Sequence, residues 1–88
     1  MYQITPYTRA KAKAAGFTVK PSTKKNKKID VYDSEGNFLA SVGQMPYLDY
    51  PHYVIEEGKK KADERRRLYH LRHTKDTLPE ILAKYLLW

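Results

Sequence analysis

The sequence predicts an α+β fold, in which a small antiparallel sheet of two or three strands packs against two C-terminal helices and follows a short N-terminal helix. Three observations predict it. Residues 28–33 and 38–42 alternate as strands do, on either side of a four-residue turn that contains Gly36. Residues 59–75 form a basic run of helical character, and residues 78–88 place apolar side chains at helical spacing. One small domain, residues 1–88, is expected.

The first helix is predicted to begin at Thr5 and to end at Gly16. Thr5 suits the N-cap, Pro6 suits the first helical position, and Gly16 suits the residue that turns the chain out of a helix. Four alanines in this segment favour helix. Residues 17–19 then form a short extended piece, and Pro21 begins a polar loop that carries four lysines.

The turn sets the register of the predicted hairpin if Asp33 lies opposite Phe38. One face then holds two apolar cross-strand pairs, Ile29 with Val42 and Val31 with Ala40. The other face pairs Tyr32 with Leu39 and Asp30 with Ser41. We expect the first face to pack against a helix, because an apolar sheet face must be covered.

The C-terminal half begins with an irregular aromatic stretch, residues 43–58, whose prolines exclude a long helix. Pro51 suits the start of a short helical turn that ends near Gly58. Residues 77–80 match a capping box, T-x-x-E, at the start of the last helix. The core is expected to contain Phe17, Val19, Ile29, Val31, Phe38, Val42, Leu68, Leu71, Ile81, Leu82, Leu86 and Trp88.

The charge balance indicates a polyanionic partner. The net charge is +7 at pH 7, which lowers the electrostatic cost of approaching RNA, DNA or an anionic membrane. Residues 59–75 hold ten Lys, Arg or His side chains and two acids. Arginine forks match phosphate oxygens, and tyrosines offer stacking faces. The alternative is that this run is a solvated face without a partner.

The predicted nucleic-acid-binding residues come from two segments and two tyrosines. In the helix, Leu68 and Leu71 are expected to face the sheet while the arginines face outward. The full set is Lys24, Lys25, Lys27 and Lys28 of the loop, Arg65, Arg66, Arg67 and Arg72 of the helix, and Tyr69 and Tyr50 as stacking residues.

The sequence predicts no catalytic site, no metal site and no cofactor. Cysteine is absent, which excludes disulfides and thiolate chemistry. His70 and His73 have the spacing of metal ligands, but a third ligand would have to be Asp49 or Glu56. A small nuclease that holds Mg²⁺ on Asp49, Glu56 or Glu64 is the enzymatic alternative, and no motif supports it. A signal peptide and a membrane span are not expected.

Three stretches carry a resemblance: TVKPSTKKNKKIDVYD at residues 18–33, KADERRRLYHLRH at residues 61–73, and KYLLW at residues 84–88. Across residues 7–88, the chain resembles a family of small basic proteins of tailed phages and, more distantly, of large DNA viruses. The resemblance implies a viral origin. It implies no activity and no site residues, because the family has no assigned chemistry. Family members often carry Gly or Pro-Gly where this chain has Thr77, Leu78 and Pro79.

The resulting hypothesis is a viral accessory protein, in the host cytoplasm or in the virion, that binds nucleic acid non-specifically. The basic helix and the lysine-rich loop would provide the contacts, to DNA or to RNA. The alternative is a virion structural or protein-interaction module whose basic face meets an acidic partner. In that case the C-terminal helix would also join copies into a homo-oligomer. No membrane partner is expected.

Overall fold

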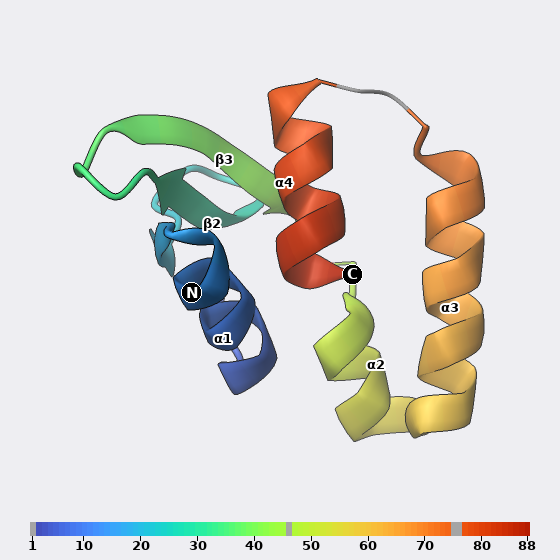
Figure 1. Ribbon diagram of the computed structural model, residues 1–88. Coiled ribbons are helices and arrows are strands. Elements are labelled where there is room, and N and C mark those ends of the chain that lie inside the picture. The colour runs from blue at the N-terminus through green and yellow to red at the C-terminus, as the bar shows by residue number, and fades with distance from the viewer. Residues whose placement is uncertain (1, 46, 75–76) are drawn as a thin grey trace.

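The computed structural model describes residues 2–45, 47–74 and 77–88. It confirms the α+β fold, with a three-stranded antiparallel sheet in the order β1-β2-β3 and four helices (Figure 1). The elements in chain order are α1 (Pro6–Ala15), β1 (Thr18–Pro21), β2 (Lys27–Tyr32), β3 (Phe38–Gln44), α2 (Tyr50–Glu57), α3 (Lys59–Arg72) and α4 (Leu78–Leu87).

The last helix is the centre of the arrangement. In Figure 1, α4 stands between the sheet and α3. It packs against β3 and α1, so it covers the apolar face of the sheet directly. The basic helix α3 packs mainly against α2. It also contacts α1 through Arg66 and Tyr7, and Trp88, directly after α4, through Tyr69.

The predicted N-terminal helix has the expected ends. Thr5 Oγ1 accepts a hydrogen bond from the backbone N–H of Thr8 (3.3 Å), and Gly16 adopts a left-handed conformation with φ 81°. Thr8 is fully buried, and its hydroxyl donates to the carbonyl oxygen of Leu86 (2.8 Å). This bond satisfies a carbonyl in the last turn of α4 and holds α1 against that helix.

The hairpin has the predicted register in its body and a different one beside the turn. Ile29 pairs with Val42, Val31 with Ala40, and Asp30 with Ser41, as predicted. Tyr32, however, pairs with Phe38 and not with Leu39, because the register shifts between Val31 and Tyr32. The unpaired residue is Leu39, which packs against the core, while Phe38 turns outward and is 50% exposed. The prediction of Phe38 as a core residue is therefore wrong.

The core lies between the inner face of the sheet and the helices α1 and α4. Phe17 and Trp88 pack at its margin. Three further core predictions are wrong. Ile81 faces outward on α4. Leu71 is 65% exposed, and Leu68 is only partly buried and lies outside the core, because α3 packs on α2 through the side that carries Ala62. The buried core residues are Tyr2, Ala12, Val19, Ile29, Val31, Ala40, Val42, Leu82, Ala83, Leu86 and Leu87.

Across the described residues, none of the helices has both the length and the apolar composition that a membrane span requires. The longest of them, α3, is also the most basic.

Gly43 allows α4 to approach β3. Its φ is +81°, a conformation that L side chains rarely adopt. A Cβ atom at this position would lie 2.8 Å from Leu87 Cδ1 and 2.9 Å from Lys28 Cβ. Contacts this short require the helix or the strand to move, so only glycine fits this junction without displacement.

We expect Gly43→Ala to lower the free energy of unfolding by about 3 kcal/mol, because it adds a steric clash to the cost of a left-handed alanine. Gly36→Ala is the matched control. Its φ is +85°, but nothing lies within 4 Å of the added Cβ. The control should therefore lose only about 1 kcal/mol. Urea unfolding of both variants measures the difference, and equal losses would show that the contact with Leu87 is unimportant.

Candidate nucleic-acid interface

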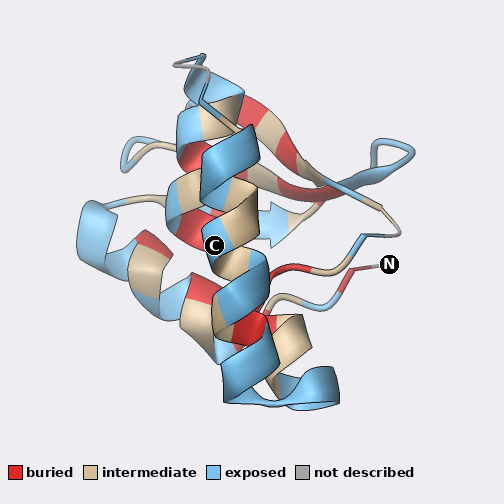
Figure 2. Ribbon diagram, turned by 90° about the vertical axis from the view of Figure 1, so that its right-hand side faces the viewer, coloured by how far each residue is buried: buried red, intermediate tan, exposed pale blue. Residues whose placement is uncertain are grey.

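The predicted basic helix exists over α3, and most of it is open to solvent. Figure 2 looks onto this helix and shows mainly exposed and intermediate residues on the side that faces the viewer. The cations predicted to bind nucleic acid nevertheless divide into groups with different roles. Some are tied to the interior of the domain, and others remain available on its surface.

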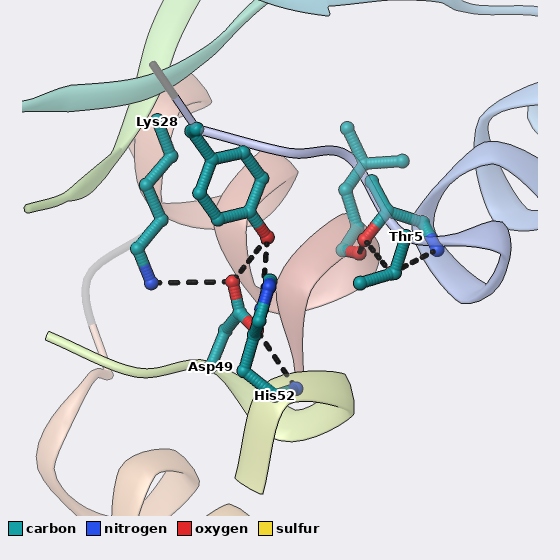
Figure 3. Close-up of polar contacts among 7 residues, drawn as sticks. Thr5, Lys28, Asp49 and His52 are labelled. Atoms are coloured by element: carbon teal, nitrogen blue, oxygen red, sulfur yellow. Dashed lines mark hydrogen bonds and ion pairs between the residues drawn. The ribbon is translucent and has the colours of Figure 1, made fainter. Parts of the chain in front are cut away.

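Lys28 belongs to the interior. Its side chain is almost fully buried, and its ammonium group lies 3.2 Å from Asp49 Oδ2 (Figure 3). Burial lowers the pKa of Lys28, and the charge of Asp49 opposes that shift. Lys28 is therefore not available to a phosphate group, contrary to the prediction from sequence.

Asp49 is the centre of this buried cluster. It is fully buried and it caps α2, because its Oδ1 accepts the backbone N–H of His52 (3.3 Å). The hydroxyl of Tyr2 donates to Oδ2 (2.5 Å), and His52 Nδ1 lies 2.6 Å from Oδ1. An ionised carboxylate can only accept, so His52 carries its proton on Nδ1. The cluster joins the N-terminal segment, β2 and α2.

These contacts determine the direction in which the pKa of Asp49 and of Tyr2 is shifted. Burial by itself would raise the pKa of Asp49, but the charge of Lys28 and the hydrogen bonds from Tyr2 and His52 outweigh it, and the pKa lies below its ordinary value. Burial and the contact with Asp49 raise the pKa of Tyr2. With both oxygens occupied, Asp49 is not available as the metal ligand that the nuclease alternative requires. Among the described residues, no group of three His, Asp or Glu side chains is placed to hold a metal ion.

Arg66 and Tyr50 also have structural roles. Tyr50 is buried, and its hydroxyl donates to Asp63 on α3 (2.8 Å). The guanidinium of Arg66 lies 3.7 Å from the centre of the Tyr50 ring and donates to the hydroxyl of Tyr7 (3.1 Å). These contacts fasten α3 to α2 and α1, so neither residue presents a free face to a nucleic acid.

Tyr69 is the middle ring of an aromatic stack. The rings of Trp88 and His73 lie nearly parallel to it, with centroids 4.3 Å and 4.1 Å away. Two parallel rings so close to a third must occupy its opposite faces, since on one face they would overlap each other. Both faces of Tyr69 are thus covered, and burial raises its pKa to about 12. Tyr69 forms a wall and not a stacking platform.

The remaining cations of α3 are exposed. Arg67 pairs with Glu64 on the same helix (2.6 Å), a solvent-exposed contact that a phosphate would readily exchange. Neither Arg65 nor Arg72 forms an ion pair with a described residue, and the guanidinium of Arg65 lies 5.5 Å from the ring of Tyr53. Both of these arginines retain their full capacity to bind anions.

Arg65 and Arg72 meet the lysine loop at a cleft of about 510 Å³. The cleft lies between α3, α4 and the open end of the β2–β3 hairpin, where β2 begins and β3 ends. Lys27 lines the cleft from the sheet side. Its described lining contains one carboxylate, Glu80, which lies 3.4 Å from His73 Nδ1. The lining contains Lys27, Lys28, Arg65, Tyr69 and Arg72 of the predicted set. The ammonium group of Lys28 is paired with Asp49 and both faces of Tyr69 are covered, so Lys27, Arg65 and Arg72 are the cations that remain available there. Lys24 and Lys25 lie exposed on the loop outside this lining.

Aromatic side chains that the sequence did not nominate complete the cleft. Tyr47, Tyr53 and Trp88 line it, and Tyr47 is 66% exposed. For Tyr47 and Tyr53, the dense run of tyrosines in residues 47–53 is the signal in the sequence that points to an aromatic surface. Arginines beside accessible aromatic rings can hold phosphates and stack unpaired bases at the same time.

Comparison of the chain with protein-family models finds no match, and neither does comparison with curated proteins or with solved structures.

Asp49→Asn tests the buried cluster, since asparagine keeps the N-cap and removes the charge. We expect a loss of about 3–5 kcal/mol at pH 7, because Lys28 is left buried without a counter-charge. The folded pKa of Asp49 lies below its unfolded value of about 3.9, so its contribution is present above that pH and is lost as the pH falls through the folded pKa. The stability difference between wild type and variant should therefore narrow below about pH 4.

Urea unfolding between pH 7 and pH 3 measures this difference. The double variant Lys28→Met with Asp49→Asn is the control, and it should be more stable than Asp49→Asn alone because no unpaired charge remains. A stability difference that does not change with pH would show that Asp49 contributes by shape and not by charge.

Proposed function

We propose that this protein binds single-stranded nucleic acid, without base specificity, in the cleft between α3 and the end of the β2–β3 hairpin. One observation carries the proposal: Lys27 from one basic segment and Arg65 and Arg72 from another line the same aromatic cleft. The sequence alone did not predict that these two segments lie beside each other. The proposal assigns binding and no reaction.

The chemistry of the cleft suits a flexible polyanion. Lys27, Arg65 and Arg72 would contact phosphates, and the exposed ring of Tyr47 would stack on a base. Such stacking tolerates every base, because each has a π-face, so it supports binding without sequence preference. A net charge of +7 adds long-range attraction for the strand.

Single strands suit this site better than duplexes. In a duplex the faces of the bases are stacked on one another, and a protein meets mainly the phosphates and the base edges. An aromatic wall inside a cleft of about 510 Å³ can be used only by bases that are unpaired. DNA and RNA strands share this chemistry, and the backbone contacts do not distinguish between them.

The biological setting rests on the resemblance to small basic proteins of tailed phages. With that origin, the proposal describes a viral accessory protein that covers or carries single-stranded intermediates in the infected cell. Arg67, Lys24 and Lys25 would add contacts outside the cleft, because they are exposed on the adjoining helix and loop.

The paired substitution Arg65→Gln with Arg72→Gln tests the cleft. Each phosphate contact to a single strand contributes about 0.7 to the slope of log K against log salt, so the slope should fall by about 1.4. Anisotropy with fluorescent oligo(dT) at several salt concentrations measures it. Arg66 stays unchanged, because its contacts with Tyr50 and Tyr7 are structural.

The matched control is Lys60→Gln with Lys61→Gln, which removes the same charge from exposed positions of α3 outside the cleft lining. It should leave the slope close to that of wild type. If both paired variants change the slope equally, binding depends on net charge and not on the cleft. If the wild type fails to bind at 50 mM salt, the proposed function is wrong.

A protein-interaction module is the second candidate function, and the outer face of α4 favours it. Leu78, Ile81 and Tyr85 are exposed there on one stripe of the helix. Lys11 and Arg66 lie beside that stripe, in a shallow groove between α1, α3 and α4. An acidic partner, or a second copy of the chain, would cover these apolar side chains.

Ile81→Ser with Tyr85→Ser tests whether α4 joins copies of the chain. Both side chains are exposed, so the fold should persist. If α4 is an interface, sedimentation velocity should show a dimer for the wild type and a monomer for the variant. A wild-type monomer at high concentration would exclude the homo-oligomer.

A further inference from the structure

The open face of the sheet carries an aromatic pair that no core contact explains. The register shift beside the turn places Tyr32 opposite Phe38, and both rings lie on the side away from the core. The ring centroids are 5.7 Å apart, and the planes meet edge to face at 71°. Phe38 is half exposed, so a large part of its ring meets solvent.

Two lysines stand over this pair. Lys20 Nζ lies 5.4 Å from the centre of the Tyr32 ring, and Lys24 Nζ lies 5.2 Å from the centre of the Phe38 ring. Cation–π contacts at exposed sites are worth only about 0.5–1 kcal/mol. A ligand with a flat aromatic group and an anion would replace these contacts, because its aromatic group can stack on the ring and its anion can bind the ammonium group. A nucleotide offers that combination.

The aromatic pair of Tyr32 and Phe38 lies further along the sheet from the cleft, in the direction of the β2–β3 turn. Ser41 lines the cleft and belongs to β3, three residues after Phe38 in the sequence. At about 3.3 Å per residue, the distance from Ser41 to Phe38 along β3 is about 10 Å. One or two nucleotides of an extended single strand cover this distance. A nucleic acid that leaves the cleft beside Ser41 can therefore reach Phe38.

Asp30 lies on β2 opposite Ser41, and its carboxylate accepts a hydrogen bond from the hydroxyl of Ser41 (2.5 Å). This negative charge repels phosphates from the middle of the sheet. Lys20 is the cross-strand neighbour of Asp30 on β1, and Lys20 and Lys24 lie over Tyr32 and Phe38. Phosphates of the nucleic acid are therefore favoured beside these two lysines, with the bases turned towards the sheet. The charge pattern favours stacking on Phe38 over a phosphate contact at the same place.

We propose that the open face of the sheet is a second contact region for the same single strand, in which Phe38 and Tyr32 stack with bases and Lys20 and Lys24 bind the adjoining phosphates. This inference rests on the proposed function, because the strand reaches the sheet from the cleft. The bound segment is then longer than the cleft, and it extends along β3 towards the β2–β3 turn.

Phe38→Ala tests the stacking contact with a fluorescent oligo(dT) of twelve nucleotides. Loss of one stacked base weakens single-strand binding by about 5- to 100-fold. The slope of log K against log salt should not change, because no charge is removed. Phe38→Leu should behave like Phe38→Ala, since it keeps an apolar side chain without a π-face, whereas Phe38→Tyr should bind like wild type.

Ile55→Ala is the matched control, because Ile55 is an exposed apolar residue of α2 outside the cleft lining. Urea unfolding confirms that all variants are folded. If Phe38→Ala binds as tightly as Ile55→Ala while the variant of Arg65 and Arg72 binds weakly, the sheet contact is wrong and the cleft stands. If only Phe38→Ala weakens binding, the nucleic acid binds at the sheet alone, and both the cleft and the path that leads from it to the sheet are wrong. If wild type does not bind, both are wrong.

Discussion

The buried carboxylate of Asp49 is the interaction on which the arrangement of the domain depends. It receives hydrogen bonds from Tyr2, Lys28 and His52, which belong to the N-terminal segment, β2 and α2. An ionised group in this position is stable only because a counter-charge and several donors surround it. The cluster determines where α2 begins, and α2 in turn positions α3. The wall of the cleft that carries Arg65 and Arg72 therefore depends on a buried contact of Lys28, which lines the same cleft from the sheet.

The basic residues follow a simple physical division. Cations that can reach an aromatic face or a carboxylate inside the domain, such as Lys28 and Arg66, become part of the packing. Exposed cations that form no ion pair with a described carboxylate, such as Arg65 and Arg72, remain at the surface and line the cleft. A cation that binds inside gives up its hydration for fixed contacts, whereas a surface cation keeps its hydration until a phosphate replaces it. The same type of side chain thus supports the fold in one place and the proposed interface in another.

Local signals were sufficient for much of the fold. The caps at Thr5 and Gly16 and the cross-strand pairs of Ile29 and Val31 depend on residues close in sequence. Of the candidate site, the sequence identified Lys27, Arg65 and Arg72 but placed Lys28 beside them as an equivalent. Nothing near Lys28 shows that it will meet a carboxylate 21 residues away. Phe38 was misassigned for a similar reason, because one unpaired residue at the bulge inverts the side-chain alternation.

The sequence by itself determined the α+β class, the ends of α1 and the excess of positive charge, because propensity, capping and composition act over a few residues. The predicted capping box at residues 77–80 did not form, because the side chain of Thr77 makes no cap hydrogen bond. It also determined that the chain contains no thiol chemistry. Only the tertiary structure decided which lysines and arginines are buried, which face of α4 meets the sheet, and that two basic segments line one cleft. Those outcomes depend on contacts between residues distant in the chain, and their energies are set by burial and by the partners that burial provides.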